Sequence, residues 1–290
     1  MRKISWRHHY LPQFYLKGFL NGNGKFIIYN VEKQRFVKNG KEFSPESYFF
    51  EKDGNSIILD NEKDDFLETS FSQIDNLVSI LFDKIRDAKN TSPFGLKDED
   101  MPALQYFIGT LFWRNPKNYD KIKKIVSEGD LKSFGVTLIN DGEKMEETIE
   151  FEEKLRSDPN FIKRMKIWIP NVTYLRILDN RTPLTIQSFP KGLPSLCSDY
   201  PIIFRNPDNP DVYSDDFIFP LTNDLLFIRA NKINNVISDI KIEIDLIILK
   251  QAIKYVSCTN PTYILMLNKL FKNYESINDL IEQVFRRLID

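Results

Sequence analysis

Cysteine and histidine are scarce in this sequence, and both shortages exclude common kinds of site. The two cysteines, Cys197 and Cys258, form no Cys-x-x-Cys pair, so no disulfide framework is expected and a reducing, cytoplasmic location is predicted. The two histidines are adjacent, at His8 and His9, and neighbours in an extended segment point to opposite sides. A metal site built from both imidazoles is therefore disfavoured, whereas one histidine completed by carboxylates fits the pattern.

Net charge and long apolar runs are lacking as well. The 40 basic and 41 acidic side chains leave a formal charge of -1, so no overall field attracts nucleic acid or an anionic membrane. Binding of a nucleotide or nucleic acid would need a local patch, and no membrane partner is expected. No run approaches the roughly 18 apolar residues of a membrane-spanning helix, and residues 1–9 lack the apolar centre of a signal peptide.

Several well-known catalytic signatures are absent. The chain contains no GxxxxGK[ST] loop, no GxGxxG after a strand, no HExxH and no GxSxG. These absences argue against Walker-type ATP hydrolysis, Rossmann cofactor binding, zincin proteolysis and α/β-hydrolase chemistry.

What the sequence does contain predicts a globular α+β fold. Its 290 residues are 42% hydrophobic and 28% charged, with 23 Phe and 12 Tyr, enough to bury a large core. Short apolar runs predict a hairpin over 26–37 and strands at 184–186, 202–204, 217–219 and 225–228. Three-to-four spacing of apolar residues predicts helices over 61–88, 98–114, 158–178, 244–256, 263–271 and 277–288.

This order of elements, hairpin, helices, strands and helices, favours α+β over a doubly wound fold. We expect a predominantly helical protein with an N-terminal β-hairpin and a small, mostly antiparallel or mixed sheet in the third quarter. Residues 1–290 are predicted to form a single domain, with the charge-rich segment 117–156 as a helical insertion or lid. In the helix over 61–88, an inward apolar stripe is predicted to include Phe66, Phe71 and Leu77.

Three polar groups stand out beside these elements. Glu68 and Asp75 are seven residues apart on one predicted helix and share nearly the same face. Two interpretations stay open: they are metal ligands, or they belong to a solvated helix surface. Arg114 ends a helix, where it is able to bind the last carbonyls, pair a buried acid, or clamp a phosphate. Ser198 and Asp199 lie between predicted strands, in a Ser or Asx turn or as a strand-end catalytic acid.

The N-terminal motif resembles that of a known family. The segment His8-His9-Tyr10-Leu11-Pro12-Gln13-Phe14-Tyr15-Leu16-Lys17-Gly18-Phe19 resembles the HHYVPQFYLRNF opening of an uncharacterised, largely bacterial group, domain of unknown function 4238. Shorter motifs follow in the family's order: Arg114-Asn115-Pro116 for R-x-P, Ser198-Asp199-Tyr200-Pro201 for S-D-x-P, Pro220-Leu221-Thr222 for P-L-[ST], and Asn260 near a late helix start. Asp75 stands where the family has Glu, and segment 117–156 has no counterpart.

The resemblance supplies no activity, but it implies that its polar residues form a site. As our own hypothesis, we assign a catalytic role to His8, His9, Arg114 and Asp199, a ligand-binding role to Tyr10, Gln13, Ser198 and Asn260, and a metal-binding role to Glu68 and Asp75.

Three hypotheses stay open. The first is a metal-dependent, nuclease-like hydrolase of a phosphodiester or nucleotide in bacterial defence. In it one histidine and the acids hold a divalent metal ion, and Arg114 stabilises charge on phosphate. The second is a non-catalytic module that binds an anion or a nucleotide. The third is a buried polar network that joins the N-terminal segment to the sheet.

Overall fold

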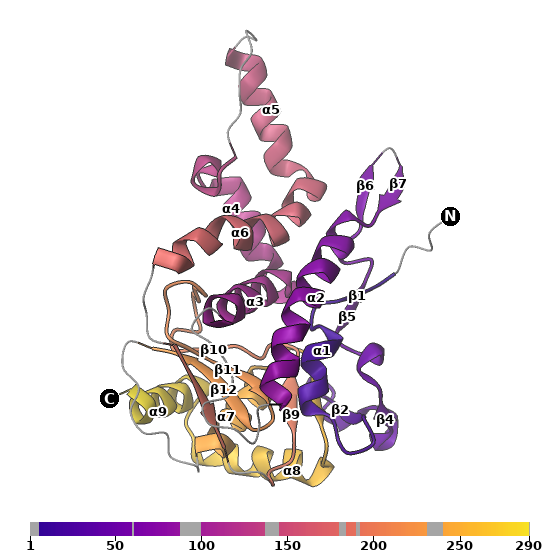
Figure 1. Cartoon of the computed structure of the whole chain (residues 1–290), viewed down its shortest axis with the longest axis vertical. Helices are drawn as coiled ribbons and strands as arrows, with labels where there is room; N and C mark the ends of the chain where they lie inside the picture. Colours follow the sequence, from indigo (N-terminus) through magenta and orange to yellow (C-terminus); the bar gives the residue numbers. More distant parts are fainter. Residues whose placement is uncertain are drawn as a thin grey trace. The chain divides into compact units, whose positions relative to one another are not determined.

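The computed structural model divides the chain into two compact units, each assembled from separated stretches of sequence (Figure 1). It describes residues 6–59, 61–87, 100–136, 145–179, 184–189, 192–230 and 240–289. Unit 1 comprises Met1–Tyr10, Phe50–Leu81 and Leu96–Asn180, and unit 2 comprises Leu11–Phe49, Phe82–Gly95 and Arg181–Asp290. The single domain over 1–290 stays a prediction, because the division reflects contacts and not independent folding.

Unit 1 is mainly helical, with short antiparallel strand pairs. Strand β1 (Arg7–His9) pairs with β5 (Phe50–Lys52), and β6 (Ile57–Leu59) pairs with β7 (Glu62–Asp64). Its helices are α2 (Phe66–Asp87, whose last residues belong to unit 2), α3 (Asp100–Arg114), α4 (Tyr119–Glu128), α5 (Met145–Ser157) and α6 (Pro159–Asp179). The 3-10 turns η5 (Pro116–Asn118) and η6 (Leu131–Phe134) flank α4.

The apolar stripe predicted for α2 is confirmed for one face and wrong for another. Phe71 is fully buried, but Phe66 and Leu77 are 54% and 73% exposed. At 100° per residue, Phe66 and Leu77 project in nearly the same direction, and Phe71 lies about 140° from Phe66 and about 120° from Leu77. The predicted stripe thus combined a core-facing row with a second apolar row that lines an open groove.

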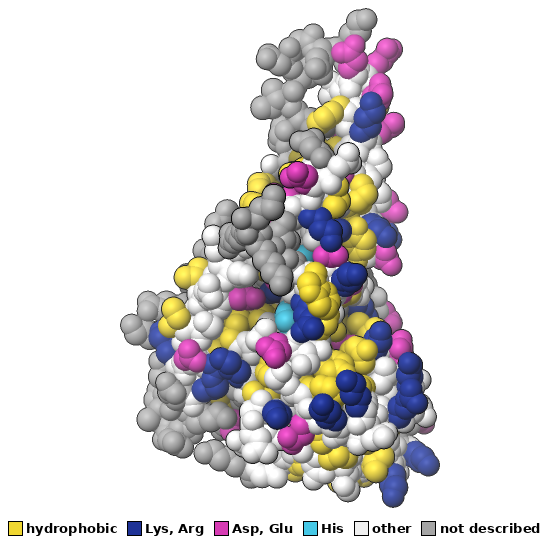
Figure 2. Space-filling model, turned by 90° about the vertical axis from the view of Figure 1, so that its right-hand side faces the viewer, with side chains coloured by type: hydrophobic (Ala, Val, Ile, Leu, Met, Phe, Trp, Pro, Cys, Tyr) yellow, Lys and Arg dark blue, Asp and Glu magenta, His cyan; other side chains and the backbone are white. Residues whose placement is uncertain are grey.

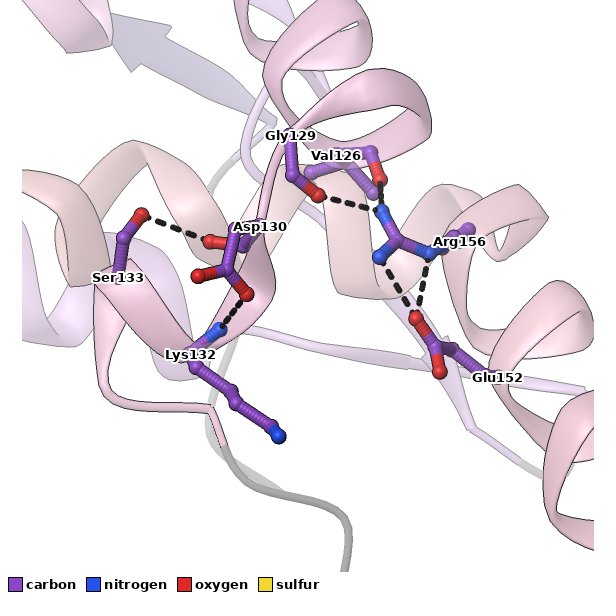
Figure 3. A network of polar contacts seen from close by, with 7 residues as sticks. All are labelled: Val126, Gly129, Asp130, Lys132, Ser133, Glu152 and Arg156. Atoms are coloured by element: carbon purple, nitrogen blue, oxygen red, sulfur yellow. Dashed lines mark hydrogen bonds and ion pairs between the residues drawn. The ribbon is translucent and has the colours of Figure 1, made fainter.

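The described parts of the charged segment 117–156, residues 117–136 and 145–156, are mainly helical, and a polar network ties α4 and α5 together (Figure 3). Nη1 of Arg156 donates to the carbonyl oxygens of Val126 and Gly129 at the C-terminal end of α4, and its Nε and Nη2 donate to Glu152. Carbonyls at a helix C-terminus lack partners and carry partial negative charge. Arg156 therefore caps α4 from α5; whether the segment acts as a lid stays a prediction.

Removing this cap should loosen the α4–α5 pair. We expect Arg156→Ala to lower the free energy of unfolding by about 1–2 kcal/mol, because the α4 carbonyls lose a charged donor. Amide hydrogen exchange should accelerate across α4. Lys154→Ala is the control, since Lys154 is 72% exposed and forms an exposed ion pair with Glu150 on the same helix; it should stay within about 0.5 kcal/mol. Equal effects of the two substitutions in urea unfolding would contradict the capping role.

Unit 2 contains two antiparallel sheets. One has the order β10 (Ile203–Phe204), β11 (Phe217–Thr222), β12 (Leu225–Arg229) and β8 (Leu184–Ser188). The other has the order β3 (Arg35–Phe36), β2 (Phe26–Asn30), β13 (Tyr255–Cys258) and β9 (Leu196–Ser198), with β4 (Glu42–Phe43) also paired to β2. Every residue of β2, β11 and β12 is buried, so these strands form the centre of the unit.

Helices and turns complete unit 2. The helices are α1 (Gln13–Leu16), α7 (Ile240–Gln251), α8 (Pro261–Leu270) and α9 (Ile277–Ile289), and the 3-10 turns are η1 (Lys17–Phe19), η2 (Val37–Gly40), η3 (Pro45–Ser47) and η7 (Phe271–Asn273). The predicted α+β class, the hairpin over 26–37 and the four predicted strands are confirmed. The helix predicted over 244–256 is wrong beyond Gln251, because Tyr255–Cys258 forms a strand between β2 and β9.

Basic, acidic and apolar side chains are interspersed on the face of the molecule in Figure 2. This mixture agrees with the near-zero net charge. In the stretches that the structure describes, no helix combines the length and apolar character needed to cross a membrane.

Candidate functional site

Several of the predicted site residues in unit 1 come together in a polar group, buried except for the half-buried Glu68 and Asp75, that we call the Arg114–Lys166 cluster. Its side chains come from β1, the turn after β5, and helices α2, α3 and α6. The members are His8, Asn55, Ser56, Glu68, Asp75, Arg114 and Lys166.

His8 is held in the cluster by the backbone of a tight turn. Its side chain is 1% exposed, and its Nδ1 accepts a hydrogen bond from the backbone N–H of Asn55 at 2.9 Å. Because Nδ1 is an acceptor, the proton of the neutral ring resides on Nε2. Gly54 permits the turn, since a Cβ there would lie 2.8 Å from the Cβ of Glu51. The motif histidine is therefore fixed in orientation.

Lys166 is a buried ammonium with weak partners. It is 3% exposed, and its Nζ donates long hydrogen bonds to the Gly54 carbonyl at 3.3 Å and to Asn55 Oδ1 at 3.4 Å. Among the described residues, no carboxylate lies within ion-pairing distance of it. Burial lowers the pKa of Lys166 to about 8. The negative charges of Glu51 and, less strongly, Glu68 oppose this change, whereas the positive charges of Lys163 and Arg114 act in the same direction.

Arg114 is equally buried and is only partly satisfied. Its Nη1 donates to both oxygens of Asp75, at 3.0 and 2.9 Å, and its guanidinium lies 4.6 Å from the Phe71 ring centre. Burial raises the pKa of Asp75, although Arg114 opposes the change. Nε of Arg114 and Oγ of Ser56 are buried without a hydrogen-bond partner among the described residues. Such orphaned polar atoms are rare in folded proteins and call for a water or ligand.

The acids of the cluster do not fit a metal centre. Glu68 accepts from Asn55 Nδ2 at 3.0 Å, and Asp75 is occupied by Arg114. Across the described ranges, no three His, Cys, Asp or Glu side chains lie close enough to hold a metal ion. Arg114 and Lys166 also place two positive charges beside these acids, which offsets the negative charge that a divalent cation would need.

The remaining predicted site residues of unit 1 have no part in these hydrogen bonds. His9 follows His8 on β1, is half-buried, and its ring lies 5.5 Å from that of Phe50. Tyr10, also half-buried, is the last residue of the first stretch of unit 1.

Unit 2 contains four predicted site residues: Gln13, Ser198, Asp199 and Asn260. The last three of these make local structural contacts. Ser198 is fully buried, and its hydroxyl bonds to the backbone of Tyr200. Asn260 caps α8 by accepting from Thr262 N–H at 2.9 Å. Gln13 is exposed at the start of α1.

Asp199 has the most extensive backbone contacts of the four. Its carboxylate accepts from the N–H groups of Ile253, Lys254 and Tyr255, at 2.7 to 2.8 Å. Burial raises the pKa of Asp199, and the three backbone hydrogen bonds oppose the increase. These contacts explain why the chain leaves helical geometry before β13, and they account for the burial of Asp199 without a ligand.

Lys166, Asn55 and Ser56 were missed by the sequence analysis. A signal for Lys166 was present, because it lies four residues after Ile162 and three before Ile169, both of which are buried on α6. A lysine on the apolar face of a helix is unusual and is often functional. Asn55 and Ser56 carried no such signal, since polar residues after a glycine turn are common.

Comparisons with known proteins give one positive result. The model of the family described as "Protein of unknown function (DUF4238)" matches residues 7–271. No curated protein and no solved structure matched the chain. The match includes both histidines, the cluster and every motif residue through Asn260. The chain therefore belongs to the DUF4238 family.

Proposed function

We propose that the Arg114–Lys166 cluster binds the phosphate group of a nucleotide. The observation that carries this proposal is the pair of buried cations, each 3% exposed, with donors that the described residues leave unused or weakly used. A buried charge without a good partner destabilises the fold unless a ligand compensates for it.

The donor arrangement favours phosphate among anions. Asp75 occupies only one nitrogen of Arg114, and it holds the guanidinium in place against Phe71. The unused Nε is one side of the planar fork with which arginine binds phosphate. Lys166 adds a point charge. A phosphate would raise the lowered pKa of Lys166, since an anion nearby favours the protonated amine.

Arg114→Lys tests this proposal, because it keeps the positive charge beside Asp75 and removes the Nε donor. Calorimetric titration of the full chain with ATP and with pyrophosphate should show binding that weakens about 10-fold or more in the variant. Arg286→Lys is the control, since Arg286 is 65% exposed on α9, and it should leave the dissociation constant within about twofold. Equal affinities in Arg114→Lys and the unchanged protein would overturn the proposal.

Hydrolysis of a bound phosphodiester is a second candidate, favoured by the buried ammonium of Lys166 as a proton donor. In such a step water would attack phosphorus, the bond from phosphorus to the leaving oxygen would break, and the Lys166 ammonium would protonate that oxygen as general acid. Release of nitrophenolate from bis(nitrophenyl) phosphate, measured with and without Mg²⁺, distinguishes a hydrolase from a module that only binds the nucleotide. Turnover that is lost in the Lys166→Met variant would favour the hydrolase. Nucleotide binding without turnover would favour the non-catalytic module.

A further inference from the structure

Unit 1 also contains an open groove that is separate from the Arg114–Lys166 cluster. The groove has a volume of about 800 Å³ and is lined by residues of α2, α3, α6 and the β6–β7 pair. Its volume falls within the roughly 300–1,000 Å³ range of small-molecule sites. The walls are mainly apolar, and aromatic rings are contributed by Phe66, Tyr106, Phe161 and Trp168.

Helix α2 separates the groove from the cluster. Phe66 and Leu77 line the groove, whereas Glu68 and Asp75 belong to the cluster. Leu77 follows Glu68 by nine residues, and Asp75 follows Phe66 by nine. Nine residues correspond to about two and a half helical turns, so each pair projects in opposite directions. The groove is therefore a second site, and its ligand is independent of the proposed phosphate site.

The apolar walls are exposed to an extent that needs an explanation. Phe66 is 54%, Leu77 is 73% and Trp168 is 43% exposed. Single exposed apolar residues are ordinary, but several that share one concave surface mark a place for a ligand. Aromatic faces favour planar ring systems, which they contact by offset or edge-to-face packing.

Arg164 offers the groove donors for an acidic ligand. Arg164 lines it and, in the described part of the chain, makes no hydrogen bond or ion pair. Asp64 also lines it and keeps its negative charge, and its Oδ1 accepts from the N–H of Phe66, at 2.7 Å, at the start of α2. The guanidinium of Arg164 is thus the lining group with unused donors, beside aromatic walls. We propose that the groove binds a small aromatic anion, with its ring system against Phe66 and Trp168 and its acid group on Arg164.

Two fluorescent probes with similar ring systems test the proposal, anilinonaphthalene sulfonate with an acid group and N-phenyl-naphthylamine without one. The sulfonate should saturate at one site per full chain. Arg164→Gln should weaken sulfonate binding about 10-fold and leave the neutral probe within about twofold, because only the sulfonate contacts the guanidinium. Equal weakening of both probes, or of neither, would show that Arg164 does not bind the acid group.

Leu77→Asp places a carboxylate in the groove at a position exposed enough to tolerate it, and it should weaken sulfonate binding about 10-fold or more. Leu265→Asp is the control, since Leu265 is 53% exposed on α8 of unit 2; it should leave binding unchanged. Competition by dodecanoate and by naphthoate distinguishes aliphatic from aromatic ligands. Displacement of the sulfonate by dodecanoate at a lower concentration than by naphthoate would overturn the aromatic class. Concentration-dependent dimerisation abolished by Leu77→Asp would instead assign the groove to a second copy of the chain.

Discussion

Asp199→Ala is expected to lower the free energy of unfolding by about 4 kcal/mol, the largest loss among the substitutions considered. The carboxylate of Asp199 is 3% exposed and accepts from three consecutive backbone N–H groups, those of Ile253, Lys254 and Tyr255. Alanine leaves these donors without a partner at the point where the chain enters β13. Urea unfolding followed by circular dichroism measures the loss.

The same experiment separates a structural role of this motif residue from a catalytic one. Asp208→Ala is the control, because Asp208 is an exposed acid in a loop of the same unit, and it should change stability by less than about 0.5 kcal/mol. Asp199→Asn should lie between the two, since an amide oxygen still accepts one of the N–H groups. A stability of Asp199→Ala equal to that of the control would favour the catalytic role that the motif suggested.

Elements with a single regular pattern were predictable from the sequence. Residues 104–111 of α3 repeat apolar side chains at helical spacing, and the structure buries them. The strands at 217–219 and 225–228 are short apolar runs bounded by Pro, Asn and Asp, and they pair as predicted. Local propensity and tertiary packing agree at these positions, so pattern alone is sufficient.

Where the prediction failed, a distant residue determined the local structure. Tyr255–Cys258 continues the apolar spacing of α7, but Asp199 binds the preceding N–H groups and the segment becomes a strand. On α2, Phe66 and Leu77 are apolar at helical spacing and still face outward. No local pattern distinguishes a core-facing row from a groove-lining row, because the difference lies in what packs against each.

The candidate site could be predicted only in part, for a similar reason. His8, Glu68, Asp75 and Arg114 were identified, and the structure places them in one cluster. Lys166 comes from α6, and its importance depends on burial, which is a property of the folded chain. Without knowledge of Lys166, Glu68 and Asp75 suggested a metal centre. With Lys166 in the cluster, these two acids lie beside two cations.

The family's motif residues also differ between the units in how fully they are satisfied. In unit 2, the polar atoms of Asp199 and Asn260 have backbone partners that explain their presence. In unit 1, Arg114 retains an unused donor and Lys166 a poorly paired charge. Incomplete satisfaction of buried polar groups is typical of sites that bind a ligand. This difference supports the proposed binding role of the unit 1 residues, whereas the contacts of Asp199 and Asn260 are structural.

Lys166→Met should make the protein more stable at pH 7 by about 2 kcal/mol while abolishing nucleotide binding. A pKa lowered from 10.5 to about 8 corresponds to about 3 kcal/mol of destabilisation at neutral pH, and loss of two long hydrogen bonds offsets part of the gain. Below about pH 8 the amine is protonated in both the folded and the unfolded chain, so the destabilisation is complete. Between about pH 8 and 10.5 only the unfolded chain keeps the proton, and the stability of the unchanged protein rises with pH.

The stability difference between Lys166→Met and the unchanged protein should therefore narrow by about 2 kcal/mol from pH 7 to pH 10 in urea unfolding. Lys154→Met, at a 72% exposed position, is the control and should stay within about 0.5 kcal/mol at both pH values. Nucleotide at about 100 times its dissociation constant should stabilise the unchanged protein by about 2.7 kcal/mol and leave Lys166→Met unaffected. A variant less stable than the unchanged protein at pH 7 would mean that the ammonium supports the fold, and the reason for assigning a ligand to the cluster would be lost.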